Sequence, residues 1–131
     1  RQMCIRDRPK GLGEPVFDKL KADLSKAMMS IPACVGVSIG RGFEFASLLG
    51  SEISGDSRNF GGMEGGISNG EEILLTLAFK APSTIGEKAK EGRHDPCILP
   101  RVVPVVEAMA KIVIADHALR QETSSLAKIH R

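Results

Sequence analysis

The sequence of 131 residues predicts an α+β fold, on the strength of three patterns. A one-sided apolar stripe at helical spacing runs from Val16 to Met29 and predicts an amphipathic helix. Alternating apolar residues from Glu71 to Lys80 predict a β-strand. A long apolar segment from about Val102 to Gln121 predicts a second helix. We therefore expect a single domain with a real core, because a chain of this length can bury one.

Prolines, glycines and β-branched residues predict the bounds of the remaining elements. Pro15 suits the first turn of the first helix, and Pro32 is expected to end it. The β-branched run from Cys34 to Ile39 predicts another strand. Seven glycines between residues 50 and 70 predict a segment without regular structure.

Two burial expectations follow from the apolar content. Both faces of the strand over 71–80 are mostly apolar, so we expect this strand to be covered on both sides. The helix over 102–121 is apolar nearly all round, so we expect it to be buried, with Pro104 tolerated only in its first turn.

The composition argues against nucleic acids and membranes as partners, and against a disulfide framework or a metal site. A net charge of +2 gives no basic field for nucleic acid or a membrane surface, and Trp and Tyr are absent. The three cysteines have no C-x-x-C spacing, which favours a reducing, cytoplasmic setting over a disulfide framework or a metal site. No apolar run approaches the ~20 residues of a membrane span.

The two ends differ from the rest of the chain. Residues 1–8 lack helical and strand periodicity, and we expect them to be a non-native leader of the kind that arises at the end of an assembled sequence. Residues 9–121 are expected to form the structural unit, and residues 122–131 a frayed polar tail.

The candidate site lies between the last strand and the long helix. Lys80 ends the apolar strand and is followed by the hydroxyls of Ser83 and Thr84. The motif GRHDPC then places Arg93 and Asp95 in a loop after Gly92. An Arg can grip a phosphate bidentately, so these residues predict an anion site. Two alternatives stay open: a solvated turn, or an Arg93–Asp95 pair that only braces the loop.

The remaining titratable side chains carry weaker signals. His94 could titrate near neutrality, but its role stays unassigned. His117 and His130 belong to no visible constellation, and Cys97 is expected to be a small buried residue.

Several long blocks resemble one known family. They are GLGEPVFDKLKADLSKAMMSIPA, GVSIGRGFEFASLLGSE, GGMEGGISNGEEI, FKAPSTI and GRHDPCILPRVVPVVEAM. In this order and at this spacing, they are similar to the C-terminal part of chorismate synthase, roughly the last third of that enzyme. The connection between FKAPST and GRHD is short, whereas many relatives carry a longer excursion there.

The resemblance implies a fold, a reaction and an assembly. The fold would be part of a β-α-β sandwich-like subunit with antiparallel strands and a Gly-rich loop, in a cytoplasmic homotetramer. The reaction would convert 5-enolpyruvylshikimate 3-phosphate to chorismate and phosphate by 1,4-elimination, with reduced FMN, in the shikimate pathway of aromatic amino acid biosynthesis.

The resemblance also implies roles for individual residues. Arg93 would lie between the flavin and the substrate phosphate, and Asp95 would be the carboxylate that handles a proton beside the flavin. The residues implied in FMN binding are Pro32, Ala33, Gly65, Lys80, Ala81, Pro82, Ser83 and Thr84.

The activity of residues 1–131 by themselves is open to a different interpretation. The family's two functional histidines and several substrate-binding arginines belong to N-terminal regions without counterpart here, so we expect the isolated chain to be inactive and poorly soluble. The alternative function is a non-catalytic flavin- or phosphate-binding module, or a vestigial structural remnant. The source of the reduced flavin stays undetermined.

Overall fold

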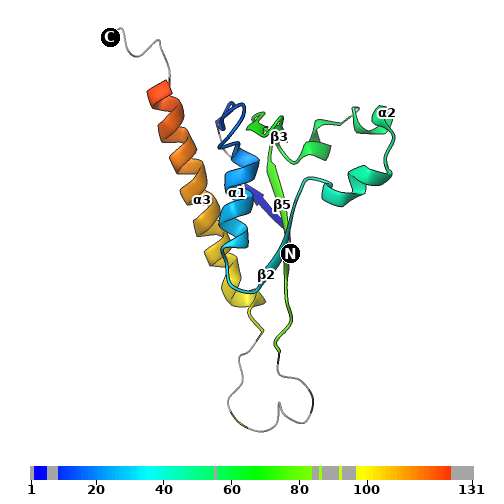
Figure 1. Ribbon diagram of the computed structural model, residues 1–131, viewed down its shortest axis with the longest axis vertical. Coiled ribbons are helices and arrows are strands. Elements are labelled where there is room, and N and C mark those ends of the chain that lie inside the picture. The colour runs from blue at the N-terminus through cyan, green and yellow to red at the C-terminus, as the bar shows by residue number, and fades with distance from the viewer. Residues whose placement is uncertain are drawn as a thin grey trace.

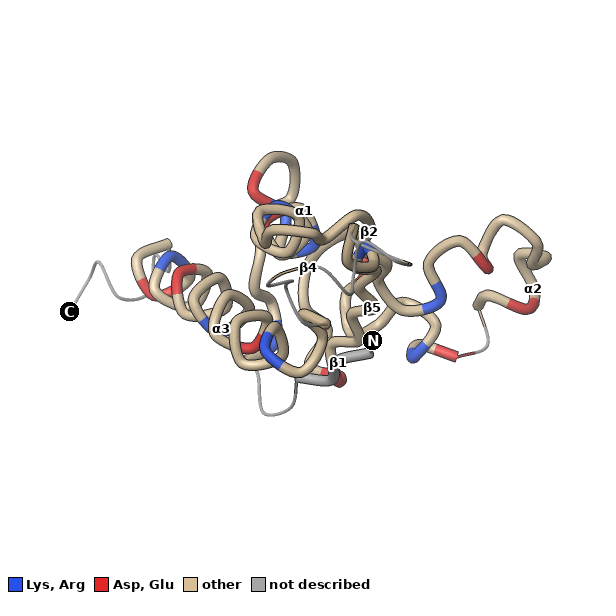
Figure 2. Tube along the Cα trace, turned by 90° about the horizontal axis from the view of Figure 1, so that it is seen from below, with Lys and Arg blue, Asp and Glu red and all other residues tan. Residues whose placement is uncertain are grey.

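A three-stranded antiparallel sheet carries two helices on one of its faces. The computed structural model describes residues 9–54, 56–83, 86, 92 and 97–124, and the backbone of 2–5. In the sheet, β5 (Ile73–Phe79) lies between β1 (Gln2–Ile5) and β2 (Cys34–Ile39). The helices α1 (Leu20–Met29) and α3 (Leu99–Ser124) lie side by side (Figures 1 and 2). The predicted α+β class with antiparallel strands is confirmed.

The core lies between β5 and the two helices. Ile73, Leu75 and Leu77 alternate along β5 and point to the same buried face. The core side chains of each helix are four residues apart, and this spacing keeps them on one face of the helix. Burial of each large apolar side chain here contributes about 1.5–3 kcal/mol. The helical members of this core are Leu20, Leu24 and Met28 on α1, and Val102, Val106 and Ala110 on α3.

The opposite faces are open, and two burial expectations were wrong. Thr76 and Ala78 on the second face of β5 are exposed, so this strand is covered on one side by the described chain. On α3, Val105, Ile112 and Leu119 are 45%, 64% and 68% exposed. The helix is therefore buried along one stripe, because only one sheet face is available to it.

The helix boundaries differ from those expected. α1 begins at Leu20, and Val16 and Phe17 are exposed in the loop before it. Asp18 has φ +55°, a left-handed conformation that a helix cannot contain. α3 is longer than predicted, so Pro104 is its sixth residue and lies beyond the first turn. The cost is limited, because a proline removes one backbone hydrogen bond, here to residue 100 near the helix start.

The glycine-rich segment contains more regular structure than expected. It forms α2 (Gly50–Ile53), a 3-10 turn at Ser57–Phe60, and the hairpin of β3 (Met63–Glu64) and β4 (Ile67–Ser68). A further 3-10 turn covers Gly42–Ser47. Residues 42–54 and 56–60 form the α2-bearing arm, which Figure 2 shows on the side of the sheet away from α3. The glycines permit close backbone packing here.

The chain ends also depart from the expectation. Gln2–Ile5 pair with Ile73–Thr76 as β1, so part of the expected leader forms a strand although its sequence lacks strand periodicity. α3 continues to Ser124, so the first residues of the expected tail are helical. The boundaries after residues 8 and 121 stay predictions. None of the described helices is long and apolar enough to cross a membrane.

A buried polar pair ties α1 to α3. His117 is 2% exposed, and its Nε2 lies 2.9 Å from Oδ2 of Asp23. Nothing in the sequence indicated this pair, because its members are 94 residues apart. On the outer side, Arg120 pairs with Asp116 at 2.8 Å and with Asp18 at 3.4 Å, both at exposed positions.

We expect Asp23→Ala to lower the free energy of unfolding by about 1–3 kcal/mol, because it leaves the buried imidazole of His117 without this partner. Asp23→Asn keeps an oxygen acceptor and should recover much of the loss. Asp116→Ala, which removes an exposed ion pair, should cost at most about 1 kcal/mol. Urea denaturation of the three variants checks this; equal losses for Asp23→Ala and Asp116→Ala would contradict it.

Candidate functional site

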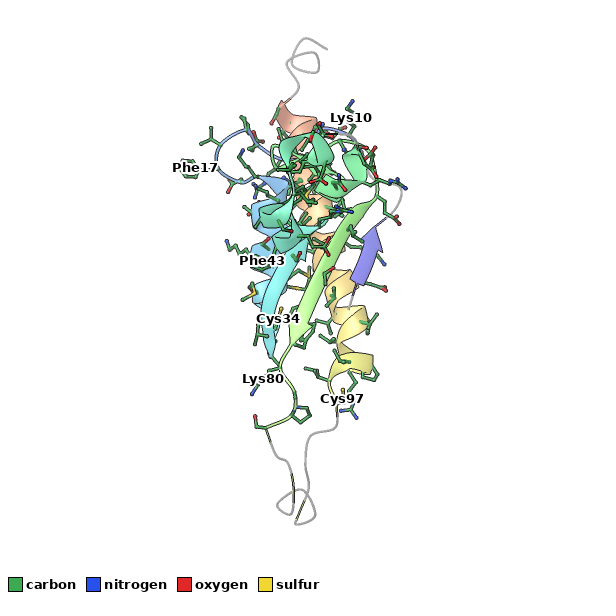
Figure 3. The ribbon with its side chains drawn as sticks, turned by 90° about the vertical axis from the view of Figure 1, so that its right-hand side faces the viewer. Lys10, Phe17, Cys34, Phe43, Lys80 and Cys97 are labelled. Carbon is green, nitrogen blue, oxygen red and sulfur yellow. The ribbon has the colours of Figure 1, made fainter. Side chains whose placement is uncertain are left out.

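Two segments meet at one end of the sheet. The first follows α1 and contains Pro32 and Ala33; the second, residues 80–83, follows β5. Cys34 and Phe79 are paired in register, and the Lys80 N–H donates to the Ala33 carbonyl at 2.9 Å. The structure thus brings together most of the residues expected at the flavin, and Figure 3 shows Lys80 just beyond the end of the strand.

Ala33 has an unusual backbone conformation. Its φ is +66°, in the left-handed region that residues with a Cβ adopt at a cost. An irregularity in the pairing of β2 follows immediately, between Cys34 and Gly36. Such strained residues concentrate at functional sites, where the surrounding structure holds them in place. Here the strain accompanies an Ala33 carbonyl that accepts the Lys80 hydrogen bond.

Lys80 and Ser83 form the polar part of this end. The Lys80 ammonium donates to Ser83 Oγ at 3.1 Å, and both residues are exposed. An ammonium has three donors, and a hydroxyl that accepts one hydrogen bond still has its own proton to donate. Pro32, Ala81 and Pro82 lie beside this pair with their small apolar side chains exposed. The arrangement suits a ligand that carries an anionic group and a flat apolar part.

The described residues that flank the β5–α3 connection lie at the same end of the molecule. Figure 3 shows Lys80, just after β5, and Cys97, just before α3, at this end. Thr84, Arg93 and Asp95 lie outside the described residues, so their roles stay predictions. Cys97 is exposed, and the expectation that it is buried was wrong.

Gly65 is not part of this cluster. It occupies the turn between β3 and β4, and its carbonyl accepts a hydrogen bond from the Lys19 ammonium at 2.7 Å. Lys19 precedes α1, whereas Ala33 follows that helix, so the two lie toward opposite ends of the molecule. The seven residues of β5 span about 20 Å between these ends. Nothing lies within 4 Å of a Cβ added at Gly65, so the turn is open on that side.

A separate hollow of about 460 Å³ lies between the open sheet face and the α2-bearing arm. Arg58 binds Asp56 through its Nε and Nη2 atoms, and this hydrogen bonding lowers the pKa of the Asp56 carboxyl. Arg41 lies 3.8 Å from Glu44. Both arginines thus have carboxylate partners, and the hollow offers no uncompensated cation. In the part of the chain that the structure describes, no three His, Cys, Asp or Glu side chains gather as a metal ion requires.

The strained backbone at Ala33 can be tested by whether a glycine there raises or lowers the free energy of unfolding. Ala33→Gly relieves the left-handed conformation and should leave the free energy of unfolding unchanged or raise it by up to about 1 kcal/mol. Ala33→Val should lower it by about 1–3 kcal/mol. The matched control is Ala22→Gly in the exposed face of α1, which should cost about 1 kcal/mol. Thermal unfolding measures both variants. An equal loss of stability in Ala33→Gly and Ala22→Gly would show that Ala33 is not strained.

Comparison with known proteins agrees on one family. The family model described as chorismate synthase matches residues 1–119. The chorismate synthases of Synechocystis sp. (strain ATCC 27184 / PCC 6803 / Kazusa) and Gloeothece citriformis (strain PCC 7424) are 48% and 50% identical to the aligned part of this chain. Each of these alignments holds 91% of this chain and 40% of the relative.

A solved structure agrees as well. The protein described as "Crystal Structure of Chorismate Synthase" matches with a TM-score of 0.76 and 32% identity, over 92% of this chain and 37% of that one. The chain thus spans about 40% of the length of the curated relatives it matches. The Synechocystis alignment extends over 144 residues, so relatives carry residues that have no counterpart here. The chain belongs to the chorismate synthase family.

Proposed function

We propose that this chain forms the FMN-binding side of a chorismate synthase active site. The reaction converts 5-enolpyruvylshikimate 3-phosphate to chorismate and phosphate by 1,4-elimination. The observation that carries the proposal is the hydrogen-bonded junction of Ala33 with Lys80, which gathers six of the eight residues expected at the flavin. Family membership supports the same reaction.

The described residues fit FMN. Lys80 offers an exposed ammonium, and Ser83 an exposed hydroxyl, for the anionic parts of the cofactor. Pro32, Ala81 and Pro82 offer small apolar surfaces against which a flat ring can lie. When bound, reduced FMN would supply electron density to a reaction that has no net redox change.

Two further residues act on the substrate in this proposal. Arg93 stabilises the negative charge that develops on the leaving phosphate, because its guanidinium stays charged and can bind two oxygens at once. Asp95 holds or moves a proton at the flavin nitrogen, which requires it to lie within hydrogen-bond reach. Both residues follow Lys80 in the sequence and precede α3, which supports a position near the Lys80 junction.

The assembly is a cytoplasmic homotetramer in this proposal. Gly65 lies in the β3–β4 turn against Lys19, toward the other end of the molecule from the Lys80 junction and outside the cluster that binds one flavin. We place its contact at the flavin of a neighbouring subunit. Residues 1–131 alone form no chorismate, since catalytic groups that act as a unit fail together when some are missing.

A hybrid enzyme tests this function. Residues 9–121 would replace the matching segment of the Synechocystis chorismate synthase, which is 48% identical. We expect the hybrid to form chorismate with reduced FMN. Arg93→Ala should lower kcat by about 10²–10³-fold, as the loss of a preorganised charge does. Asp95→Asn should lower it by about 10²–10⁴-fold, as the loss of a proton-transfer group does.

The control is Lys21→Met, at an exposed position on α1, which should leave the rate unchanged. A hybrid that folds and binds FMN but makes no chorismate would favour the non-catalytic flavin-binding alternative. Retention of full activity in Arg93→Ala or Asp95→Asn would remove that residue from the proposed mechanism.

A further inference from the structure

The hairpin that carries Gly65 is too small to hold itself in place. β3 and β4 contribute two residues each, and Gly65 and Gly66 form the turn. Both glycines have positive φ, +60° and +91°, as a two-residue type I′ turn requires. An isolated two-stranded hairpin is at best marginally stable in water, so this turn needs support from outside.

The base of the hairpin is fixed by the loop before α1. Ser68 is 2% exposed, and its hydroxyl accepts from the Leu12 N–H at 2.9 Å and donates to the Pro9 carbonyl at 2.7 Å. Backbone hydrogen bonds join Ser68 to Gly11 and Leu12 in addition. These contacts hold β4 in place, but none of them involves the turn residues Gly65 and Gly66.

Lys19 is that partner. Its ammonium donates to the Gly65 carbonyl at 2.7 Å. Its stem covers the next residue: a Cβ added at Gly66 would lie 2.6 Å from Cδ and 2.9 Å from Cβ of Lys19. A single side chain therefore contacts both turn residues, on one side only, and Gly65 stays open on the other. Because Lys19 leads directly into α1, the support comes from a rigid element.

The geometry points to Lys19 as a positioning residue that holds the Gly65 turn in the shape that receives the flavin. This inference rests on the proposed function, because Gly65 is a site residue only there. Lys19 itself contacts the turn and acts through it. The ammonium fixes the direction of the Gly65 carbonyl, and the stem excludes any residue larger than glycine at position 66.

The test uses two variants and one matched control. Lys19→Met keeps most of the apolar stem and removes the ammonium, whereas Lys19→Arg keeps a cationic donor. Lys21→Met removes an exposed ammonium two residues further along. Amide hydrogen exchange at Gly65 and Gly66 in the hybrid enzyme without FMN reports on the turn, and the Kd of the same hybrid for FMN reports on the site.

In Lys19→Met we expect exchange at the turn to be about two- to thirteenfold faster and the Kd for FMN to be about two- to thirteenfold higher, the range for one net hydrogen bond. Lys19→Arg and Lys21→Met should resemble the unchanged protein in both measurements. Unchanged exchange in Lys19→Met, or faster exchange with an unchanged Kd, overturns the inference alone. An unchanged hybrid that binds no FMN overturns the proposed function as well, so the two failures are distinguishable.

Discussion

The packing of one face of β5 against α1 and α3 is the constraint on which the other features depend. Ile73, Leu75 and Leu77 alternate, so all three enter the same core as the apolar stripes of the helices. Because α1 runs along this face and continues into β2, its end is carried to the end of β5. The end of that strand, where Lys80 follows Phe79, and the start of α3 are fixed at the same end of the molecule.

The junction at that end combines a backbone hydrogen bond with a strained residue. The Lys80–Ala33 hydrogen bond extends the pairing of β2 and β5 past the last regular pair, and Ala33 has a left-handed conformation there. A glycine would adopt this conformation freely, yet the sequence has alanine there. A strained residue beside an exposed Lys80–Ser83 pair is the combination expected where the backbone must meet a ligand in one orientation.

The sequence predicted the elements that depend on periodicity. The core stripe of α1 and the alternation of β5 were visible, because helical and strand spacing are local properties. The start of α1 was predicted too early, because Val16 and Phe17 continue the apolar pattern. The sequence around Asp18 does not indicate its left-handed conformation. The exposure of α3 was also missed, because an apolar surface does not tell which of its sides the described chain can cover.

The candidate site was predictable to a different extent. Lys80, Ser83, Arg93 and Asp95 were found from motifs close together in the sequence, and the pairing of β2 with β5 brings Ala33 to the first two. Contacts between distant residues left no local signal, as with the Lys19 hydrogen bond to Gly65, 46 residues away, and the His117–Asp23 pair. Such contacts depend on how the finished elements are placed, which spacing along the chain cannot reveal.

Amide hydrogen exchange of the hybrid enzyme, measured with and without FMN, shows where the flavin binds. Slower exchange on FMN binding is expected in the segments 33–36 and 79–83, with no change in the middle of α3, whose buried side chains belong to the core. Slower exchange confined to the α2-bearing arm, with segments 33–36 and 79–83 unaffected, would contradict the claim that the flavin binds at the Ala33–Lys80 junction.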